Sequence, residues 1–523
     1  MTDSGDHGGN GHTIGSWLAD SARTFPNRIA VDDRGVQTTY AALARRVDRL
    51  VGRLTDAGYR PGDRVATLTG NSVDHVVAMF ACARLGLALV PISWRLAAAE
   101  VADQLTVADP HLVVVEDEYA TLAQRALGLL PEPPPSAAFA GLESYVPPRS
   151  HRTPPGAQRE VTDTDPLLIL FTSGSSGRPK AAVLTHATCF WTNLSLSRTV
   201  PLTRDDVVLA VMPQHHAGGW NVQPLLAWWV GATVVLERTF DPRRILELIR
   251  TRGVTTMMGV PTHYHLLASH RGFASADLSS LRNAVVGGAP ATAPLLRTWH
   301  SRGVRLTQGY GLTEAGPNVL CLMPEEAFNH VGSAGRPYHH VEVALADPVT
   351  GAVIDGAGTG ELLVRGPGLF GGYFNDPEAT QRAISDGWLK TGDLVTRDDL
   401  GYHTVVDRID DIFITGGENV SPTEVEKVLL RHPEVEAAAV VGVPDDRWGE
   451  VGCAFVVRRP GSVVDADELR AHCREELASF KVPVRVELVS ELPYGSSDKL
   501  SRRSLRDRAA RLADAATVRT EGS

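Results

Sequence analysis

Apolar and polar residues alternate along the chain up to about residue 320, in a pattern that switches between two periods. Over residues 40–57 and 73–86 the apolar positions recur at helical spacing, which predicts helices. The runs VATLT at 65–69 and LALVPIS at 87–93 are short and apolar, as is typical of buried strands. Because strands and helices alternate in this way, we expect a large N-terminal α/β domain of two subdomains with largely parallel sheets.

The pattern changes after about residue 341. Short runs such as VEVALAD, GELLVRG and YHTVV alternate with Gly, Asp and Pro turns up to residue 406, which predicts a small β-barrel-like subdomain. From Arg408 onward a compact strand and helix pattern of about 110 residues predicts a small, mobile α+β domain with its own core. We therefore expect an N-terminal domain over 1–407 and a C-terminal domain over 408–523.

Two stretches are expected to lack regular structure. Residues 131–155 are rich in proline and serine and are interpreted as a surface connection. The tail after Leu505 is highly charged, so we expect it to fray.

The composition narrows the classes of function. The 523 residues carry a formal net charge of −10, which argues against a general nucleic-acid surface. The first dozen residues lack the pattern of a signal peptide, and no apolar run approaches about 18 residues, so we expect no membrane span. The scattered cysteines form no CxxC pair, which predicts reduced, mostly buried thiols in a cytoplasmic protein. They are Cys82, Cys189, Cys321, Cys453 and Cys473.

A glycine- and serine-rich loop follows the apolar run PLLILF. It reads TSGSSGRPK, from Thr172 to Lys180. Glycines let backbone N–H groups approach an anion, hydroxyl groups add donors and lysine adds positive charge, so the loop can serve phosphates. Its spacing matches neither the Walker pattern nor the nucleophile elbow. Composition alone leaves an ordinary flexible turn as the alternative.

Seven further segments follow in a characteristic order. They are PQHHAGG at 213–219, GGAP at 287–290, QGYGLTE at 308–314, GWLKTGD at 387–393, DRIDD at 407–411, GGEN at 416–419 and LPYGSSDK at 492–499. With the loop at Thr172–Lys180 they resemble the motifs of the adenylate-forming superfamily. That superfamily includes acyl-CoA synthetases, firefly luciferases and the adenylation domains of peptide synthetases.

The resemblance implies a nucleotide site that binds ATP and then AMP. Its residues are Thr172, Ser173, Gly174, Ser175, Ser176, Gly177, Lys180, Gly287, Gly288, Ala289, Gly309, Tyr310, Gly311, Thr313, Asp393 and Arg408. Tyr310 is implied to face the adenine, and Asp393 to accept hydrogen bonds from the ribose hydroxyls. Glu314 is implied to be the Mg²⁺ ligand, since a hard cation prefers oxygen donors.

The resemblance also implies an acyl pocket and a thiol site. The pocket candidates are His215, His216, Gly218, Gly219, Trp220, Val222, Tyr264, Gly288, Pro317, Asn318 and Val319. The candidates beside the thiol of coenzyme A are Gly416, Gly417 and Glu418, and Asp410 is the implied hinge. The implied catalytic residues are Lys499, His216, Thr172 and Glu314. Small and apolar pocket residues suit a bulky hydrophobic acid, whether fatty, aryl or polycyclic.

The implied activity is that of an AMP-forming acyl-CoA ligase. A carboxylic acid and ATP give an acyl-adenylate and pyrophosphate; coenzyme A then gives acyl-CoA and AMP, with rotation of the C-terminal domain between the two steps. Ala181, Asp407 and Asp498 stand where the superfamily usually has glycine. An enzyme that only thioesterifies a preformed acyl-adenylate, and a silent nucleotide-binding regulator, are therefore the alternatives. A carrier protein as acceptor and a homodimer also stay open.

Overall fold

The computed structural model describes residues 12–149, 159–173, 179–416, 418–445, 447–495 and 500–520. The chain forms two compact units. The larger unit consists of the residues up to Val343 together with the segment Val364–Leu389. The smaller unit consists of Ala344–Leu363 and the residues from Lys390 onward. Residues 344–363 and 390–407 are thus grouped with the C-terminal residues, and the domain boundary expected at residue 407 stays a prediction.

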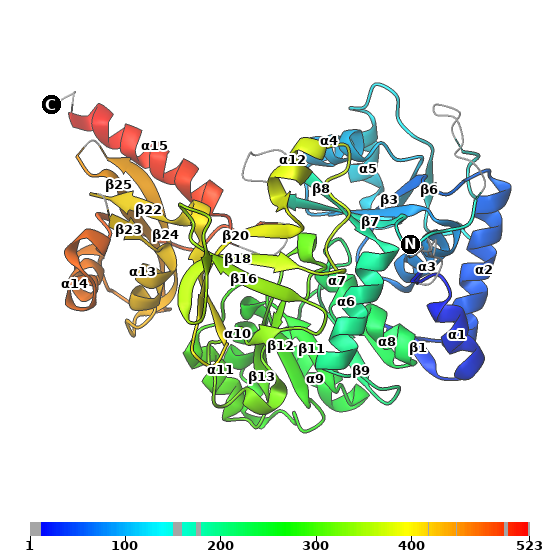
Figure 1. Ribbon diagram of the computed structural model, residues 1–523, viewed down its shortest axis with the longest axis horizontal. Coiled ribbons are helices and arrows are strands. Elements are labelled where there is room, and N and C mark those ends of the chain that lie inside the picture. The colour runs from blue at the N-terminus through cyan, green and yellow to red at the C-terminus, as the bar shows by residue number, and fades with distance from the viewer. Residues whose placement is uncertain are drawn as a thin grey trace, which may run out of the picture. The chain divides into compact units, whose positions relative to one another are not determined.

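The first sheet of the larger unit has six strands in the order β6-β5-β3-β4-β7-β8 (Figure 1). They are β3 (Arg64–Leu68), β4 (Ala88–Ile92), β5 (Leu112–Val115), β6 (Ser136–Ala138), β7 (Pro166–Ser173) and β8 (Pro179–Thr185). All neighbours are parallel except β7 and β8, which are antiparallel. Helices α4 (Ala98–Ala108) and α5 (Ala120–Leu127) bury Val101, Leu105 and Ala126 in the core of this sheet.

The second sheet has nine strands in the order β15-β14-β13-β12-β11-β9-β10-β1-β2. They are β1 (Ile29–Asp33), β2 (Val36–Thr39), β9 (Val207–Ala210), β10 (Thr233–Leu236), β11 (Thr256–Gly259), β12 (Asn283–Val286), β13 (Leu306–Tyr310), β14 (Leu320–Cys321) and β15 (Arg336–Pro337). The pairs from β1 through β13 are parallel, and β2, β14 and β15 add antiparallel edges. The two α/β subdomains expected from the sequence are confirmed.

Helices complete both layers of the larger unit. They are α1 (Trp17–Thr24), α2 (Tyr40–Asp56), α3 (Val73–Leu85), α6 (His186–Thr199), α7 (Gly218–Asn221), α8 (Pro224–Val230), α9 (Pro242–Arg252), α10 (Pro261–Ser269), α11 (Ala293–His300) and α12 (Pro377–Ala383). Local signals explain their bounds. The Ser72 hydroxyl accepts from the His75 N–H at the start of α3, and Gly86 ends that helix in the left-handed conformation.

A third, largely antiparallel sheet follows the order β17-β16-β18-β20-β19, with β21 beside β20. Its strands are β16 (Glu342–Ala346), β17 (Val353–Ile354), β18 (Gly358–Arg365), β19 (Ile384–Ser385), β20 (Trp388–Arg397) and β21 (His403–Arg408). This is the small β subdomain that the Gly, Asp and Pro turns predict.

The C-terminal residues form a fourth sheet in the order β23-β22-β25-β24, with β26 parallel to β25. Its elements are β22 (Phe413–Thr415), β23 (Glu418–Val420), β24 (Val435–Asp445), β25 (Gly449–Arg458), β26 (Arg485–Val489), α13 (Pro422–Leu429), α14 (Ala466–Glu476) and α15 (Arg502–Thr520). Successive side chains of β24 point alternately into two hydrophobic cores. Val440 packs with α13 and α14, whereas Ala439 and Val441 pack with Leu505 of α15.

The expectation of irregular structure for residues 131–155 is wrong at three residues, and the expectation that the tail frays is wrong. Residues Ser136–Ala138, inside the proline-rich stretch, form β6, because their backbone pairs with Val113–Val115 of β5. The charged tail is helical as far as Thr520. Two arginines in its first turns form ion pairs that hold the helix in place. Arg502 pairs with Glu426 and Asp411, and Arg506 pairs with Asp411. Leu505 and Ala509 fill the core beneath.

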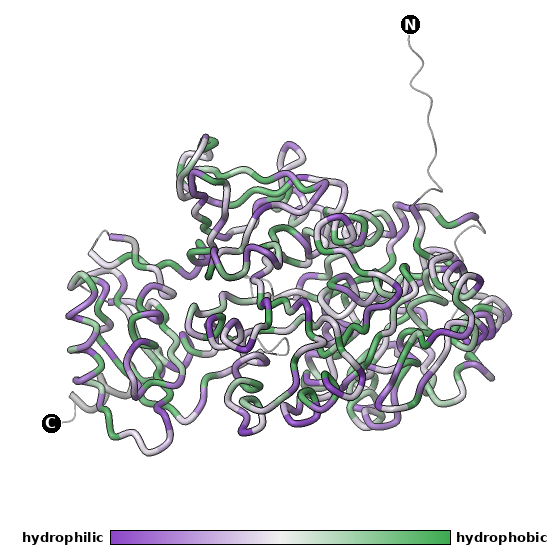
Figure 2. The backbone as a smooth tube through the Cα atoms, turned by 90° about the horizontal axis from the view of Figure 1, so that it is seen from below, coloured by the Kyte–Doolittle hydropathy of each residue, from purple (hydrophilic) through white to green (hydrophobic). Residues whose placement is uncertain are grey.

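The distribution of apolar residues agrees with a chain whose elements each bury one face. Figure 2 shows hydrophobic and hydrophilic stretches alternating throughout the traced chain. Among the described residues, no helix combines the length and apolar character that a membrane crossing needs. All five cysteines are buried and free of disulfides, as expected.

Candidate active site

Three oxygen-bearing side chains converge at the end of the glycine-rich loop's first strand. Thr172, near the end of β7, places its hydroxyl 3.4 Å from Oε1 of Glu314. Tyr373 donates its hydroxyl to the same oxygen at 2.8 Å. Glu314 lies in a short 3₁₀ helix, Thr313–Ala315, that follows β13. The structure therefore brings together two residues that the sequence singles out and one that it does not.

The convergence depends on the backbone of residues 370–374. Gly371 donates to the Val183 carbonyl at 2.8 Å, and Phe374 donates to the Ala181 carbonyl at 2.8 Å, so this segment runs antiparallel to β8. Phe370 also donates its N–H to the Glu314 carbonyl at 2.9 Å. The segment thus attaches the glutamate loop to the strand that leaves the glycine-rich loop.

Lys180 begins this exit strand with its ammonium group near the same cluster. Its Nζ lies 5.0 Å from the centroid of the Tyr373 ring, in cation–π geometry. Ala181, which replaces a usual glycine, pairs with Phe171 in extended strand conformation, so the structure does not demand a glycine there. Gly174, Ser175, Ser176 and Gly177 lie outside the described residues, as does the side chain of Ser173.

The oxygen donors of the cluster suit a hard cation. Mg²⁺ commonly takes one or two protein carboxylates and completes its shell with phosphate oxygens and water. Glu314 and the hydroxyl of Thr172 fit that requirement together with a nucleotide. Within the described ranges, three or more His, Cys, Asp or Glu residues nowhere gather into a metal cage. A site that depends on the phosphates of ATP for its remaining ligands is therefore the arrangement that the chain supports.

Gly311, three positions before Glu314, must be a glycine because another part of the backbone lies close to it. A Cβ atom on Gly311 would lie 1.4 Å from the carbonyl oxygen of Pro317. Asn221 donates to the Gly316 carbonyl at 2.9 Å, and Asn318 donates to the Asn221 carbonyl at 3.2 Å. The segment from Tyr310 to Asn318 is therefore folded back on itself and fixed to α7. Of the expected pocket residues, Asn318 is buried and Pro317 half-buried.

The turn that carries His215 and His216 is held by its neighbour Gln214. The Gln214 side-chain oxygen lies 3.2 Å from Nδ1 of His75 and accepts from the Ser72 N–H at 3.3 Å. Its backbone N–H donates to Asn71, and its carbonyl accepts from the indole of Trp220 at 2.6 Å. Gln214 is therefore hydrogen-bonded both to the start of α3 and to α7.

The two histidines lie close together at the start of α7. Their ring centroids are 4.4 Å apart, with His215 buried and His216 half-buried. Gly219 follows, and a Cβ atom there would lie 2.3 Å from the Pro213 carbonyl oxygen. A glycine at this position is thus what allows the turn to close. His216 lies in this turn, and its expected role beside the carboxylate stays a prediction.

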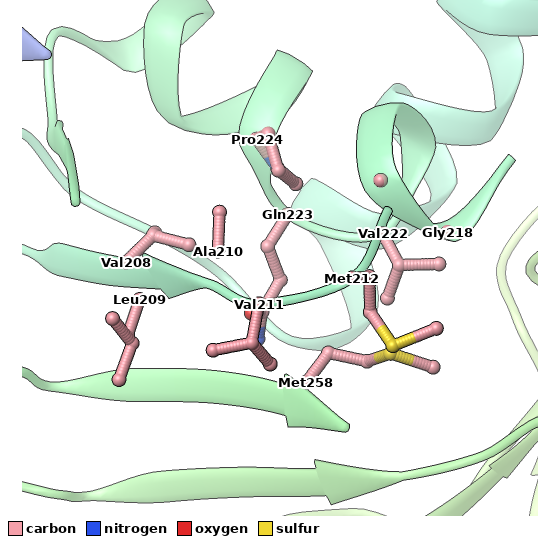
Figure 3. Close-up of a pocket in the computed structure, with 11 residues that line it drawn as sticks. Val208, Leu209, Ala210, Val211, Met212, Gly218, Val222, Gln223, Pro224 and Met258 are labelled. Carbon is pink, nitrogen blue, oxygen red and sulfur yellow. The ribbon is translucent and has the colours of Figure 1, made fainter. Parts of the chain in front are cut away.

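An apolar pocket adjoins this turn (Figure 3). It is lined by Val208, Leu209, Ala210, Val211, Met212, Gly218, Gly219, Val222, Gln223, Pro224 and Met258. The thioether ends of Met212 and Met258 point toward each other in Figure 3. Of the residues expected in the acyl pocket, Gly218, Gly219 and Val222 line this cavity. The two methionines stand in no motif and were not predicted.

Trp220 and Tyr264, both expected to line the acyl pocket, are completely buried. The Trp220 indole bonds to Gln214, and the Tyr264 hydroxyl lies 3.0 Å from the carbonyls of Met257 and Val285. Burial raises the pKa of Tyr264 well above its ordinary value. Their polar groups are therefore committed to the core, and any contact with the acid would be through ring carbons.

The expected adenine segment lies at the end of β12. Gly287 donates to the Gly259 carbonyl at 3.0 Å and is buried, whereas Gly288 and Ala289 are exposed. Gly309 and Tyr310 belong to the adjacent strand β13. The larger unit thus presents an exposed turn beside the strand that leads to Thr313 and Glu314.

The smaller unit brings Asp393 and Arg408 together. Strands β20 and β21 place them opposite each other, and Nε of Arg408 lies 3.3 Å from Oδ1 of Asp393. Asp393 is buried and Arg408 is exposed. Asp410 lies in the short 3₁₀ helix Ile409–Asp411, and Gly416 and Glu418 are exposed near the turn between β22 and β23. Gly417, Asp498 and Lys499 lie outside the described residues.

Comparison with known proteins identifies the family of the chain. The model of the AMP-binding enzyme family matches residues 18–374, and that of the AMP-binding enzyme C-terminal domain matches residues 424–499. A feruloyl-CoA synthase from Amycolatopsis sp is 41% identical over 496 residues, covering 95% of this chain and 99% of the relative. A fatty acid–[acyl-carrier-protein] ligase, ScoC, from Streptomyces coeruleorubidus is 36% identical, covering 93% and 94%.

A solved relative shows the same fold with a reaction intermediate bound. The o-succinylbenzoate CoA synthetase of Bacillus subtilis, in complex with its acyl-adenylate intermediate, matches with a TM-score of 0.83 and 30% identity. The match covers 94% of this chain and 98% of the relative. Both family models and nearly full-length relatives lead to one conclusion: the chain belongs to the AMP-binding enzyme family, as an ATP-dependent acyl-CoA ligase of the adenylate-forming superfamily.

Proposed function

We propose that the protein activates a hydrophobic aryl acid of the arylpropenoate type and transfers its acyl group to coenzyme A. The carrying observation is that Thr172 and Lys180, paired on the two strands that flank the glycine-rich loop, lie with Glu314 in one cluster around Tyr373. An aryl acid is favoured over a fatty acid because two relatives are named for ring-bearing acids, 2-succinylbenzoate and indoleacetate. The 41% identical relative is named for an aryl substrate, which supports the same choice.

The first half-reaction forms the acyl-adenylate. A carboxylate oxygen attacks the α-phosphorus of ATP, and the bond to pyrophosphate breaks. The chain contributes positioning and charge: Lys180 and the glycine-rich loop hold the phosphates, and His216 borders the carboxylate. Glu314 would hold Mg²⁺, which would supply charge neutralisation around the adenylyl group that is transferred to the carboxylate. Lys499 is assigned from its sequence position to the reacting phosphate and carboxylate.

The second half-reaction transfers the acyl group to sulfur. The thiolate attacks the acyl carbon, AMP leaves with the electron pair of the broken C–O bond, and the thiol proton passes to solvent. We assign Asp393 to the ribose hydroxyls, Gly416, Gly417 and Glu418 to the thiol arm, and Asp410 to the pivot of domain rotation. The thioesterification-only enzyme and the silent regulator are not favoured, since nearly full-length relatives are named as complete ligases.

The experiment is a coupled assay of the purified chain with Mg²⁺, ATP and a thiol. Arylpropenoic, arylacetic, fatty and polycyclic acids are supplied in turn, with coenzyme A or a phosphopantetheinylated carrier protein as acceptor. AMP and the thioester are measured by mass spectrometry. We expect both products with arylpropenoic acids and coenzyme A. A preference for fatty acids or for the carrier protein would refute the proposed substrates, and AMP from no acid would refute the adenylation step.

A homodimer and a cytoplasmic location stay predictions. Sedimentation of the purified chain at several concentrations tests the first. A single species of monomer mass throughout would contradict it.

A further inference from the structure

Tyr373 contacts two charged residues of the candidate nucleotide site, Glu314 and Lys180, through different parts of its side chain. Its hydroxyl donates to Oε1 of Glu314 at 2.8 Å. Its ring face lies 5.0 Å below Nζ of Lys180. One tyrosine therefore engages the carboxylate and the ammonium group at the same time.

Backbone bonds fix this tyrosine as firmly as a core residue. Its N–H donates to the hydroxyl of Thr380 at 2.8 Å, and it forms an antiparallel bridge with Ala182 of β8. Its ring also packs edge-on against Phe370, with centroids 4.9 Å apart. Because α12, β8 and Phe370 all constrain it, the hydroxyl has little freedom to leave Glu314.

The hydrogen bond selects one oxygen of the carboxylate. Oε1 of Glu314 receives the tyrosine hydroxyl and lies 3.4 Å from that of Thr172. Within the part of the chain that the structure describes, no hydrogen bond reaches Oε2 of Glu314. A carboxylate held through one oxygen can offer the other to a cation in a fixed direction.

The ring affects the neighbouring lysine differently. An ammonium group over an aromatic face is stabilised without being neutralised, so it keeps its charge for an anion. Among the described ion pairs, none joins Lys180 to Glu314. The lysine contacts the ring face and the glutamate contacts the hydroxyl, so each can serve its own partner, the lysine the phosphates and the glutamate the cation. If the ring were absent, opposite charges in one site would favour a direct pair that closes it.

We propose that Tyr373 is a positioning residue of the nucleotide site: its hydroxyl orients Glu314 toward the divalent cation, and its ring keeps Lys180 available to the phosphates. The proposal rests on the proposed function of Glu314 and Lys180. It adds a role for a tyrosine that acts through both residues and need not touch ATP.

The central variant is Tyr373→Phe, which keeps the ring, its stacking on Phe370 and the cation–π contact but removes the hydroxyl. We expect the Mg²⁺ concentration for half-maximal ATP–pyrophosphate exchange to rise about tenfold, since Glu314 then loses the hydrogen bond that orients its carboxylate. The KM for the acid should not change. Binding of AMP without Mg²⁺, measured by calorimetry, should also match that of the wild-type protein.

A second variant, Tyr373→Leu, removes the ring as well. We expect it to weaken binding of ATP even in EDTA, because Lys180 then pairs with Glu314. Tyr145→Phe, at an exposed tyrosine, is the matched control and should behave as the wild type in every titration. Thermal unfolding confirms that each variant is folded.

Two outcomes would overturn the proposal. One is a Tyr373→Phe protein whose Mg²⁺ dependence equals that of the wild type. The other is a lower kcat at every Mg²⁺ concentration with no shift of the midpoint, which indicates a merely structural role. If the wild type shows no exchange with any acid, the proposed function fails separately. Calorimetric titration of Mg²⁺-ATP into both proteins then still compares their cation dependence.

Discussion

The carboxylate of Asp407 accepts a 2.6 Å hydrogen bond from the hydroxyl of Ser421, fourteen positions further along the chain. The same oxygen accepts from the N–H of Thr423 at 3.0 Å, in the first turn of α13. Its other oxygen accepts from the N–H of Arg408 at 2.9 Å. The residue that replaces a usual glycine just before the proposed pivot therefore fastens the end of β21 to the start of α13.

Replacing Asp407 by glycine should loosen this attachment. We expect the free energy of unfolding of the smaller unit to fall by about 2 kcal/mol, because a buried carboxylate with three donors is removed and the Thr423 N–H at the start of α13 loses its acceptor. Hydrogen exchange at the Thr423 amide should accelerate. Asp355→Gly, at an exposed position of the same unit, is the control. Equal exchange rates in Asp407→Gly and the wild type would show that the bonds do not fasten the helix.

Replacing Glu314 by glutamine tests the cation site directly. The amide keeps the shape of the side chain but removes the negative charge that Mg²⁺ needs. We expect ATP–pyrophosphate exchange to fall by about 100-fold or more, while thioester formation from a supplied acyl-adenylate falls less. Glu325→Gln changes an exposed carboxylate nearby and should leave both rates intact. Exchange at the wild-type rate in Glu314→Gln would rule out this residue as the ligand.

Adjacent glycines in the histidine turn should respond differently to alanine. A methyl group at Gly219 would lie 2.3 Å from the Pro213 carbonyl, whereas at Gly218 its nearest neighbour is Cε of Met212 at 3.6 Å. We expect Gly219→Ala to lower the free energy of unfolding by about 2 kcal/mol. Gly218→Ala should change it by less than about 1 kcal/mol. Urea denaturation measures both, and similar values for the pair would contradict the close contact.

Two buried histidines should make the protein sensitive to mild acid. Burial lowers the pKa of His75 to about 3 and that of His186 to about 4. The hydrogen bond from His75 to Gln214 and the charge of Glu116 act in the opposite direction but are weaker. In the unfolded chain each imidazole binds a proton near pH 6.5. Stability is therefore complete above that pH and is lost as the pH falls toward the folded values, by up to about 1.4 kcal/mol per pH unit for each group.

The measurement is urea denaturation at pH 7, 6 and 5. The variant His75→Gln removes one of the two groups, so its stability should fall less steeply with decreasing pH than that of the wild type. His265→Gln, at an exposed histidine, should keep the wild-type slope. Parallel curves for His75→Gln and the wild type would show that His75 is not the titrating group.

Local signals account for the elements that sequence reasoning placed well. The helix expected over residues 40–57 is α2 (Tyr40–Asp56), because its apolar positions are periodic and the Thr39 hydroxyl caps its start. The structure of the charged tail was harder to predict, since a high density of charge by itself suggests a frayed end. Its arginines are instead satisfied by Glu426 and Asp411, which lie far back in the sequence.

In the candidate site, too, some residues could be predicted from local motifs and others could not. Motif spacing predicts Thr172 and Glu314, and the structure brings them together. Tyr373 was not predicted, because its place beside Glu314 comes from strand pairing with β8, almost two hundred positions earlier. The bond between His75 and Gln214 likewise spans 139 positions. Contacts of this range depend on the whole fold, and no local pattern of residues carries them.

The burial of the cysteines has a consequence for the fate of the intermediate. Burial raises the pKa of Cys82, Cys189 and Cys321 to about 12, and that of Cys453 and Cys473 to about 11. Only a thiolate is an effective nucleophile, so at neutral pH these side chains stay protonated and inert. An acyl-adenylate acylates any reactive sulfur that it meets. The enzyme therefore protects itself from self-acylation, and the activated acid is kept for the thiol that arrives from outside.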